Sequence, residues 1–151
     1  MDTYQAHVLE CASGVELTIA LYDGIVRFMN QAIEAVEQND AEQRRAAVKR
    51  AMDIVMHLQV TLDRDRGGKP AEALTEFYTA IFALMLQGSQ ANSRQKFEQV
   101  IAHVRNVREG WKQVLAEIHA NDVAEGGAVD AGTGSYAAPA FGPGRGSSWT
   151  V

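Results

Sequence analysis

The chain has 151 residues, of which 46% are hydrophobic, and its formal net charge is −5. This length predicts one domain, and the acidic balance argues against nucleic acid or an anionic membrane as the partner. A lone cysteine excludes an internal disulfide, and the sequence shows neither a secretory signal nor an apolar run long enough for membrane insertion. We therefore expect a soluble protein of the reducing cytoplasm.

The first twelve residues precede a helix-start signal. Within residues 1–12, Tyr4 and Val8 lie one helical turn apart. Ser13 and Glu16 then match the S-x-x-E capping box, which predicts that a helix starts at Ser13. Beyond it, apolar residues recur every three or four positions, as on one face of a helix. Residues 1–12 are therefore expected to form a short N-terminal helix or lid.

Three further helices follow from similar signals. Asp40 with Gln43 is a second capping-box candidate and predicts the start of the second helix. Gly67-Gly68 ends that region, and Pro70 is acceptable in the first turn of a third helix. Asn92 or Ser93 begins a fourth. Four helices joined by short loops predict an all-α, antiparallel up-down four-helix bundle.

The composition changes sharply near residue 120. Residues 121–151 hold seven of the 13 glycines and two of the three prolines, and such a segment buries too little apolar surface to offset its ordering entropy. We predict a bundle domain over residues 13–120, followed by a disordered Gly-rich C-terminal tail. Its aromatic residues, Tyr136, Phe141 and Trp149, are either incidental or mark a tail that docks on its own bundle or mimics a client.

Patterns for catalysis or metal binding are weak. No histidine follows a glutamate at the three-residue spacing of a di-iron bundle, and Asp53 with His57 offers only two ligands. A histidine phosphotransfer bundle needs an exposed helical histidine. His57 is the candidate, but Val60 stands where a lysine is usual. We therefore expect no enzyme activity, no cofactor and no metal.

Four motifs follow one another along most of the predicted bundle. They are Tyr4-Gln5 with Ala12-Ser13-x-x-Glu16-Leu17; Leu21-Tyr22-Asp23-Gly24 with Arg27-Phe28; Leu62-Asp63-x-x-Arg66-Gly67-Gly68-x-x-Ala71-x-x-Leu74-x-x-x-Tyr78; and Glu109-x-Trp111. In this order and spacing, from about Tyr4 to Gln113, they resemble the signatures of the flagellar secretion chaperones that bind flagellin, the FliS family.

The resemblance implies a helical bundle without catalytic activity. It would bind the disordered C-terminal segment of flagellin in the bacterial cytosol, prevent premature polymerisation and keep the subunit competent for flagellar type III secretion. The implied complex is one-to-one, with the export apparatus, a co-chaperone or a second copy of the chain as further candidate partners. Two alternatives stay open: a histidine phosphotransfer-like signalling bundle, and an interaction bundle for another secreted subunit.

The candidate partner-binding residues divide into an apolar and a polar set. A client helix would lay its apolar face into grooves between bundle helices. The apolar candidates are Tyr4, Val8, Leu21, Ile54, Leu58, Leu74, Tyr78 and Trp111, and the polar candidates are Gln5, Tyr22 and Asp23. For Trp111 and for Tyr22 to Gly24, packing inside the bundle is the competing interpretation.

The sequence departs from the family pattern at two places. Gly14 stands where the family usually has a proline after the capping serine, so the first turn is expected to be looser. Ala80, Ala83 and Leu84 stand where the third helix often carries an aromatic residue and an arginine pair. This leaves an unusually apolar third helix, and we expect its surplus surface to be covered by a client, the tail or a second copy.

Overall fold

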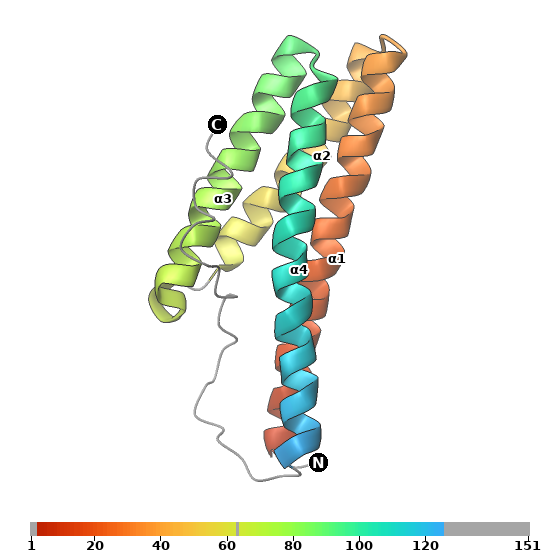
Figure 1. Cartoon of the computed structure of the whole chain (residues 1–151). Coiled ribbons are helices and arrows are strands. Elements are labelled where there is room, and N and C mark those ends of the chain that lie inside the picture. Colours follow the sequence, from red (N-terminus) through yellow and green to blue (C-terminus); the bar gives the residue numbers. More distant parts are fainter. Residues whose placement is uncertain (1–2, 63, 126–151) are drawn as a thin grey trace.

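The computed structural model describes residues 3–62 and 64–125 (Figure 1). Its four helices are α1 (Thr3–Glu37), α2 (Ala41–Thr61), α3 (Arg64–Ala91) and α4 (Arg94–Glu125). They run alternately up and down, and no strand occurs in the described part of the chain. The predicted all-α antiparallel bundle is confirmed.

The first helix begins earlier than the sequence predicts. α1 is continuous through Ser13, so the predicted start at the capping box is wrong, and residues 3–12 are the first turns of α1. Two causes are visible. Ala12 and Val15 are both buried, so core packing continues across the expected boundary. Gly14 also retains the backbone N–H that a proline would lack, so the helical ladder is not interrupted there.

The starts of α2 and α4 agree with the predictions, whereas α3 begins at Arg64, before the start expected near Pro70. The Asp40 carboxylate accepts a hydrogen bond from the Gln43 backbone N–H at 3.0 Å, and the Ser93 hydroxyl accepts one from Lys96 N–H at 3.3 Å. Both side chains thus cap a helix N-terminus. Gly68 has φ 56° and ψ −137°, a left-handed conformation that separates the first turn of α3 from its main body.

α4 extends beyond the predicted end of the bundle. It is helical to Glu125, so residues 121–125 belong to the last turns of α4 and not to the tail. The remainder of the predicted tail, residues 126–151, lies outside the described residues. The boundary predicted at residue 120 is therefore too early, because the Gly-rich composition starts only at Gly126.

The core lies where all four helices overlap. α1 packs against α2 and α4, and α3 closes the ring between α2 and α4. Below this region α1 and α4 continue as a pair past the lower ends of α2 and α3 (Figure 1). We call residues 3–17 of α1 together with residues 112–125 of α4 the foot. Trp111 is the last buried residue of α4 in the described part of the chain.

The apolar surplus of α3 is mostly used inside the bundle. Ala80 and Leu84 are buried, so the expectation of open surface is wrong at these positions. The reason is that α3 contacts α2 on one side and α4 on the other, which covers a broad face of the helix. Phe82 and Ala83 are half-buried, and Leu86 is 39% exposed.

Close approach of α3 to α4 depends on Gly88. A Cβ atom at this position would lie 2.8 Å from the ring of the fully buried Phe97. We expect Gly88→Ala to lower the free energy of unfolding by about 1–3 kcal/mol through overpacking, less the ~1 kcal/mol of helix propensity that alanine adds. Urea unfolding followed by circular dichroism measures this change.

Gly24→Ala is the matched control. Its Cβ would meet only the terminal methyl of the half-buried Ile54, at 3.1 Å. That methyl can shift by a few tenths of an ångström at a small cost. Because the gain in helix propensity offsets this cost, the free energy of unfolding should be nearly unchanged. Equal unfolding midpoints for the two variants would contradict the close-approach argument.

Candidate functional site

Three aromatic side chains from three helices meet in the core. The hydroxyl groups of Tyr22 (α1) and Tyr78 (α3) lie 2.7 Å apart, and the Trp111 indole N–H (α4) donates to the Tyr22 hydroxyl at 3.0 Å. All three residues are at most 1% exposed. We call them the aromatic triad. It joins three of the four sequence motifs through one buried polar connection.

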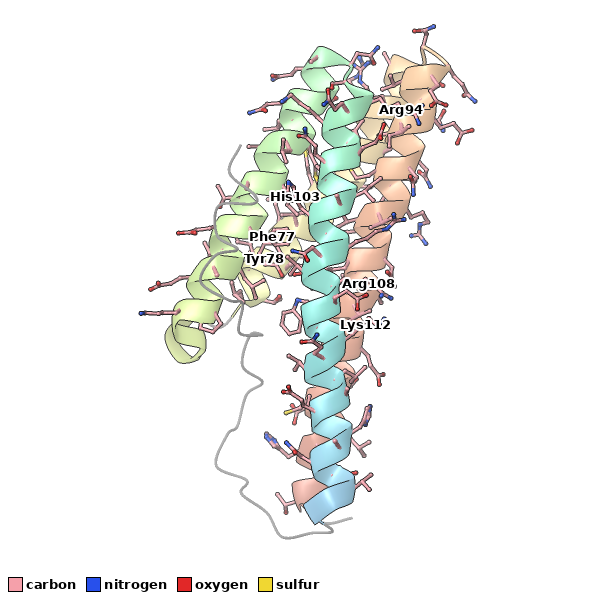
Figure 2. The ribbon with its side chains drawn as sticks, viewed as in Figure 1. Phe77, Tyr78, Arg94, His103, Arg108 and Lys112 are labelled. Carbon is pink, nitrogen blue, oxygen red and sulfur yellow. The ribbon has the colours of Figure 1, made fainter. Side chains whose placement is uncertain are left out.

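The triad is embedded in further apolar packing. The Tyr22 and Tyr78 rings meet edge-on with centroids 6.3 Å apart, and the Phe77 ring lies 5.4 Å from that of Tyr78. Figure 2 shows Phe77 and Tyr78 on the side of α3 that faces α4. Leu58 and Leu74 are buried in the same core. Five candidate partner-binding residues therefore lie inside the closed bundle, where a client reaches them only if helices separate.

Asp23 has a different environment at the surface. Its two carboxylate oxygens accept hydrogen bonds from Arg108 Nε at 2.7 Å and Nη2 at 3.2 Å, which connects α1 to α4. The hydrogen bond to Asp23 raises the pKa of Arg108. An open pocket of about 540 Å³ beside this pair is also lined by Arg105 and Glu109. Because both signs of charge line it, the pocket favours neither anions nor cations.

The remaining candidates lie at the edge of the core or in the first turns of α1. Leu21 and Ile54 are partly buried and pack against the core, and Val8 is half-buried. The side chains of Tyr4 and Gln5 lie outside the described residues, although their backbone belongs to α1. The structure thus brings Tyr22, Tyr78 and Trp111 together and leaves the N-terminal candidates apart from them.

The foot carries exposed apolar side chains that the sequence reasoning did not select. Leu9 is 56% exposed, Leu17 57% and Val123 82%. Half-buried apolar residues accompany them on α4, namely Val114, Leu115 and Ile118. Leu17 begins the apolar repeat that follows Ser13, which predicts a core-facing position. It is exposed because it lies off the buried stripe of α1: at about 100° per residue it is about 100° around the helix from buried Thr18 and about 200° from buried Val15.

Two further titratable groups outside the triad have shifted pKa values. Burial lowers the pKa of His103, and burial together with Glu10 raises the pKa of Cys11. The Asp53 carboxylate accepts from Lys49 Nζ at 3.2 Å on the exposed side of α2. No cluster of three or more His, Cys, Asp or Glu side chains suited to a metal occurs among the described residues. Within the same ranges, no helix has the length and apolar character needed to span a bilayer.

The two tyrosines of the triad should differ in their contribution to stability. Of the two bonds in the triad, Tyr22→Phe removes both, whereas Tyr78→Phe removes only the bond between the two hydroxyl groups. We expect losses of about 1–3 kcal/mol for Tyr22→Phe and about 1 kcal/mol for Tyr78→Phe in urea unfolding. A larger loss for Tyr78→Phe would show that Tyr22 is not the central member.

Comparison with known proteins agrees with this arrangement. The family model described as flagellar protein FliS matches residues 1–118. The flagellar secretion chaperone FliS of Campylobacter jejuni (strain 81116) is 32% identical over 113 residues, which cover 75% of this chain and 88% of that protein. The chaperone of the same name from Salmonella typhimurium LT2 is 32% identical over 104 residues, covering 68% and 77%.

A third relative is more distant but equally extensive. The flagellar secretion chaperone FliS of Bacillus subtilis (strain 168) is 27% identical over 112 residues, which cover 74% of this chain and 83% of that protein. The residues matched by the family model, 1–118, contain all four motifs and every member of the aromatic triad. By its sequence, its four-helix architecture and the extent of these matches, the chain belongs to the FliS family.

Proposed function

We propose that this protein is a cytosolic export chaperone that binds the C-terminal segment of flagellin, one-to-one, along the foot. The observation that carries the proposal is the exposure of Leu9, Leu17 and Val123 on a two-helix extension of a protein in this family. The relatives that match this chain over most of their own length are named flagellar secretion chaperones. Keeping a subunit unpolymerised requires binding and no catalysis.

The foot is suited to a helical partner. In the bundle each helix is covered by two neighbours, whereas in the foot α1 and α4 cover only each other (Figure 1). Half-buried Val114 and Ile118 lie one turn apart on α4, which matches the spacing at which an amphipathic client helix presents its anchors. A client helix seated there would complete a local three-helix core and remove exposed apolar surface from water, at about 25 cal/mol per Å².

The closed half of the bundle has a supporting role in this proposal. Since the triad is buried and hydrogen-bonded, it holds α3 against the α1–α4 pair and defines where the foot begins. Leu21 and Ile54, at the edge of the core, then extend the client surface upward from Leu17. The candidates Leu58, Leu74, Tyr78 and Trp111 act from beneath that surface as its support.

The first test is calorimetry with a flagellin peptide. A peptide of about 40–50 residues from the C-terminus of the same organism's flagellin should bind one-to-one, with a negative heat-capacity change that reports apolar burial coupled to folding. The double variant Leu9→Ser/Leu17→Ser should weaken binding by about tenfold or more, because it places two hydroxyl groups in the apolar contact.

Leu86→Ser is the matched control for this test. Leu86 is an exposed leucine at the opposite end of the molecule, on α3, and its replacement should leave the affinity unchanged. Equal affinity of all three proteins would place the client elsewhere. Binding of a different secreted subunit, with no binding of flagellin, would favour the general interaction bundle.

The first turns of α1 are either a client contact or a lid, and a deletion separates the two roles. Residues 3–12 carry half-buried Val8 and exposed Leu9, and their backbone is continuous with the core helix. Because Leu9 belongs to the proposed client surface, deleting residues 1–10 should weaken flagellin binding in the same calorimetric experiment. Tighter binding would make these turns a lid over that surface, and unchanged affinity would remove them from the mechanism.

A further inference from the structure

We propose that residues 126–151 dock through their aromatic side chains onto the foot of their own bundle. Leu9, Leu17 and Val123 are exposed residues of the foot, and the segment follows directly after Glu125, the last residue of α4. Four observations support this occupant: where α4 ends, how far the segment reaches, its composition, and its position relative to the family match.

The segment starts beside the surface it is proposed to cover. The Asp23–Arg108 pair fixes the antiparallel register of α1 and α4. Leu9 comes fourteen residues before Asp23 on α1, so in this register it is level with Asp122 in the last turns of α4, near Glu125, where the described chain ends. Leu17 lies eight residues further along α1, about 12 Å up the helix axis.

The length of the segment matches these distances. The first aromatic residue, Tyr136, comes eleven residues after Glu125. A flexible chain of that length has a root-mean-square reach of about 17–20 Å, which spans the foot up to Leu17. Phe141 and Trp149 follow after further intervals of five and eight residues, so the aromatic side chains can contact the foot while the glycines between them loop away.

The composition favours an apolar contact. Asp130 and Arg145 are the only charged residues of the segment, and their charges cancel. Docking therefore removes little charge from water. Three aromatic side chains supply a large apolar area at a low cost in side-chain entropy, and the polar ends of Tyr136 and Trp149 can remain at the rim of the contact.

The segment is an addition to the part shared with relatives. The family match ends at residue 118, and the Campylobacter jejuni relative aligns with 75% of this chain. The aromatic residues at 136, 141 and 149 therefore lie outside the shared bundle, whereas the foot lies largely within it. Docking would give this chain an internal competitor for its client surface, and this consequence rests on the proposed function.

Methyl NMR of the full chain, without any client, tests the docking. The reference is the full chain, and the comparison is Tyr136→Ser/Phe141→Ser/Trp149→Ser. We expect shifted methyl resonances at Leu9, Leu17 and Val123, with the Leu86 methyls unchanged as the internal control. The shifts should persist on tenfold dilution, because the contact is intramolecular. Identical foot resonances in the two proteins, or differences that vanish on dilution and so report a second copy, would overturn the proposal.

Competition is measured separately with the flagellin peptide. If docking covers the client surface, the triple serine variant should bind the peptide several-fold more tightly than the unchanged chain. Equal affinity would show that the segment does not compete with the peptide for the foot. The methyl spectra would then decide on their own whether the segment docks. If neither protein binds the peptide, the proposed function fails, and the methyl spectra still decide whether the segment docks.

Discussion

The buried hydrogen bonds among Tyr22, Tyr78 and Trp111 are the interaction on which the rest of the structure depends. A polar group in the core is costly unless it is paired, and here one hydroxyl satisfies partners on two other helices. Apolar side chains alone would allow α3 to slide along the α1–α4 pair. The donor and acceptor geometry permits one register, so these bonds specify the bundle as well as stabilise it.

That register determines which surfaces remain open. With α3 held at the level of Trp111, the lower parts of α1 and α4 have no third helix beside them (Figure 1). The foot is therefore a direct consequence of how the upper half packs. The same arrangement explains why α3, although unusually apolar, offers little free surface: its apolar face is divided between α2 and α4.

The sequence predicted the fold well and the site only in part. Local signals were sufficient where a single residue caps a helix or breaks its backbone geometry, as Asp40, Ser93 and Gly68 do. They failed at Ser13, because the capping pattern says nothing about core packing on both sides of it. The motifs selected Tyr22 and Trp111 but left client contact and core packing open for both, and periodicity could not show that Leu17 is exposed. Which side of the apolar repeat faces the core is decided by tertiary packing, which here buries Val15 and Thr18.

The continuity of α1 has a mechanical consequence. From Leu9 to Tyr22 it is one uninterrupted helix, about 20 Å of rigid rod that begins in the foot and ends at the buried hydroxyl. A pulling force on a client seated along the foot would act at the free end of this rod, with the triad as its fulcrum. Contacts would then open one after another from the tip, as in peeling, which requires a smaller peak force than breaking them all at once. If the proposed function holds, the geometry that would hold a subunit firmly at rest would thus also release it under tension.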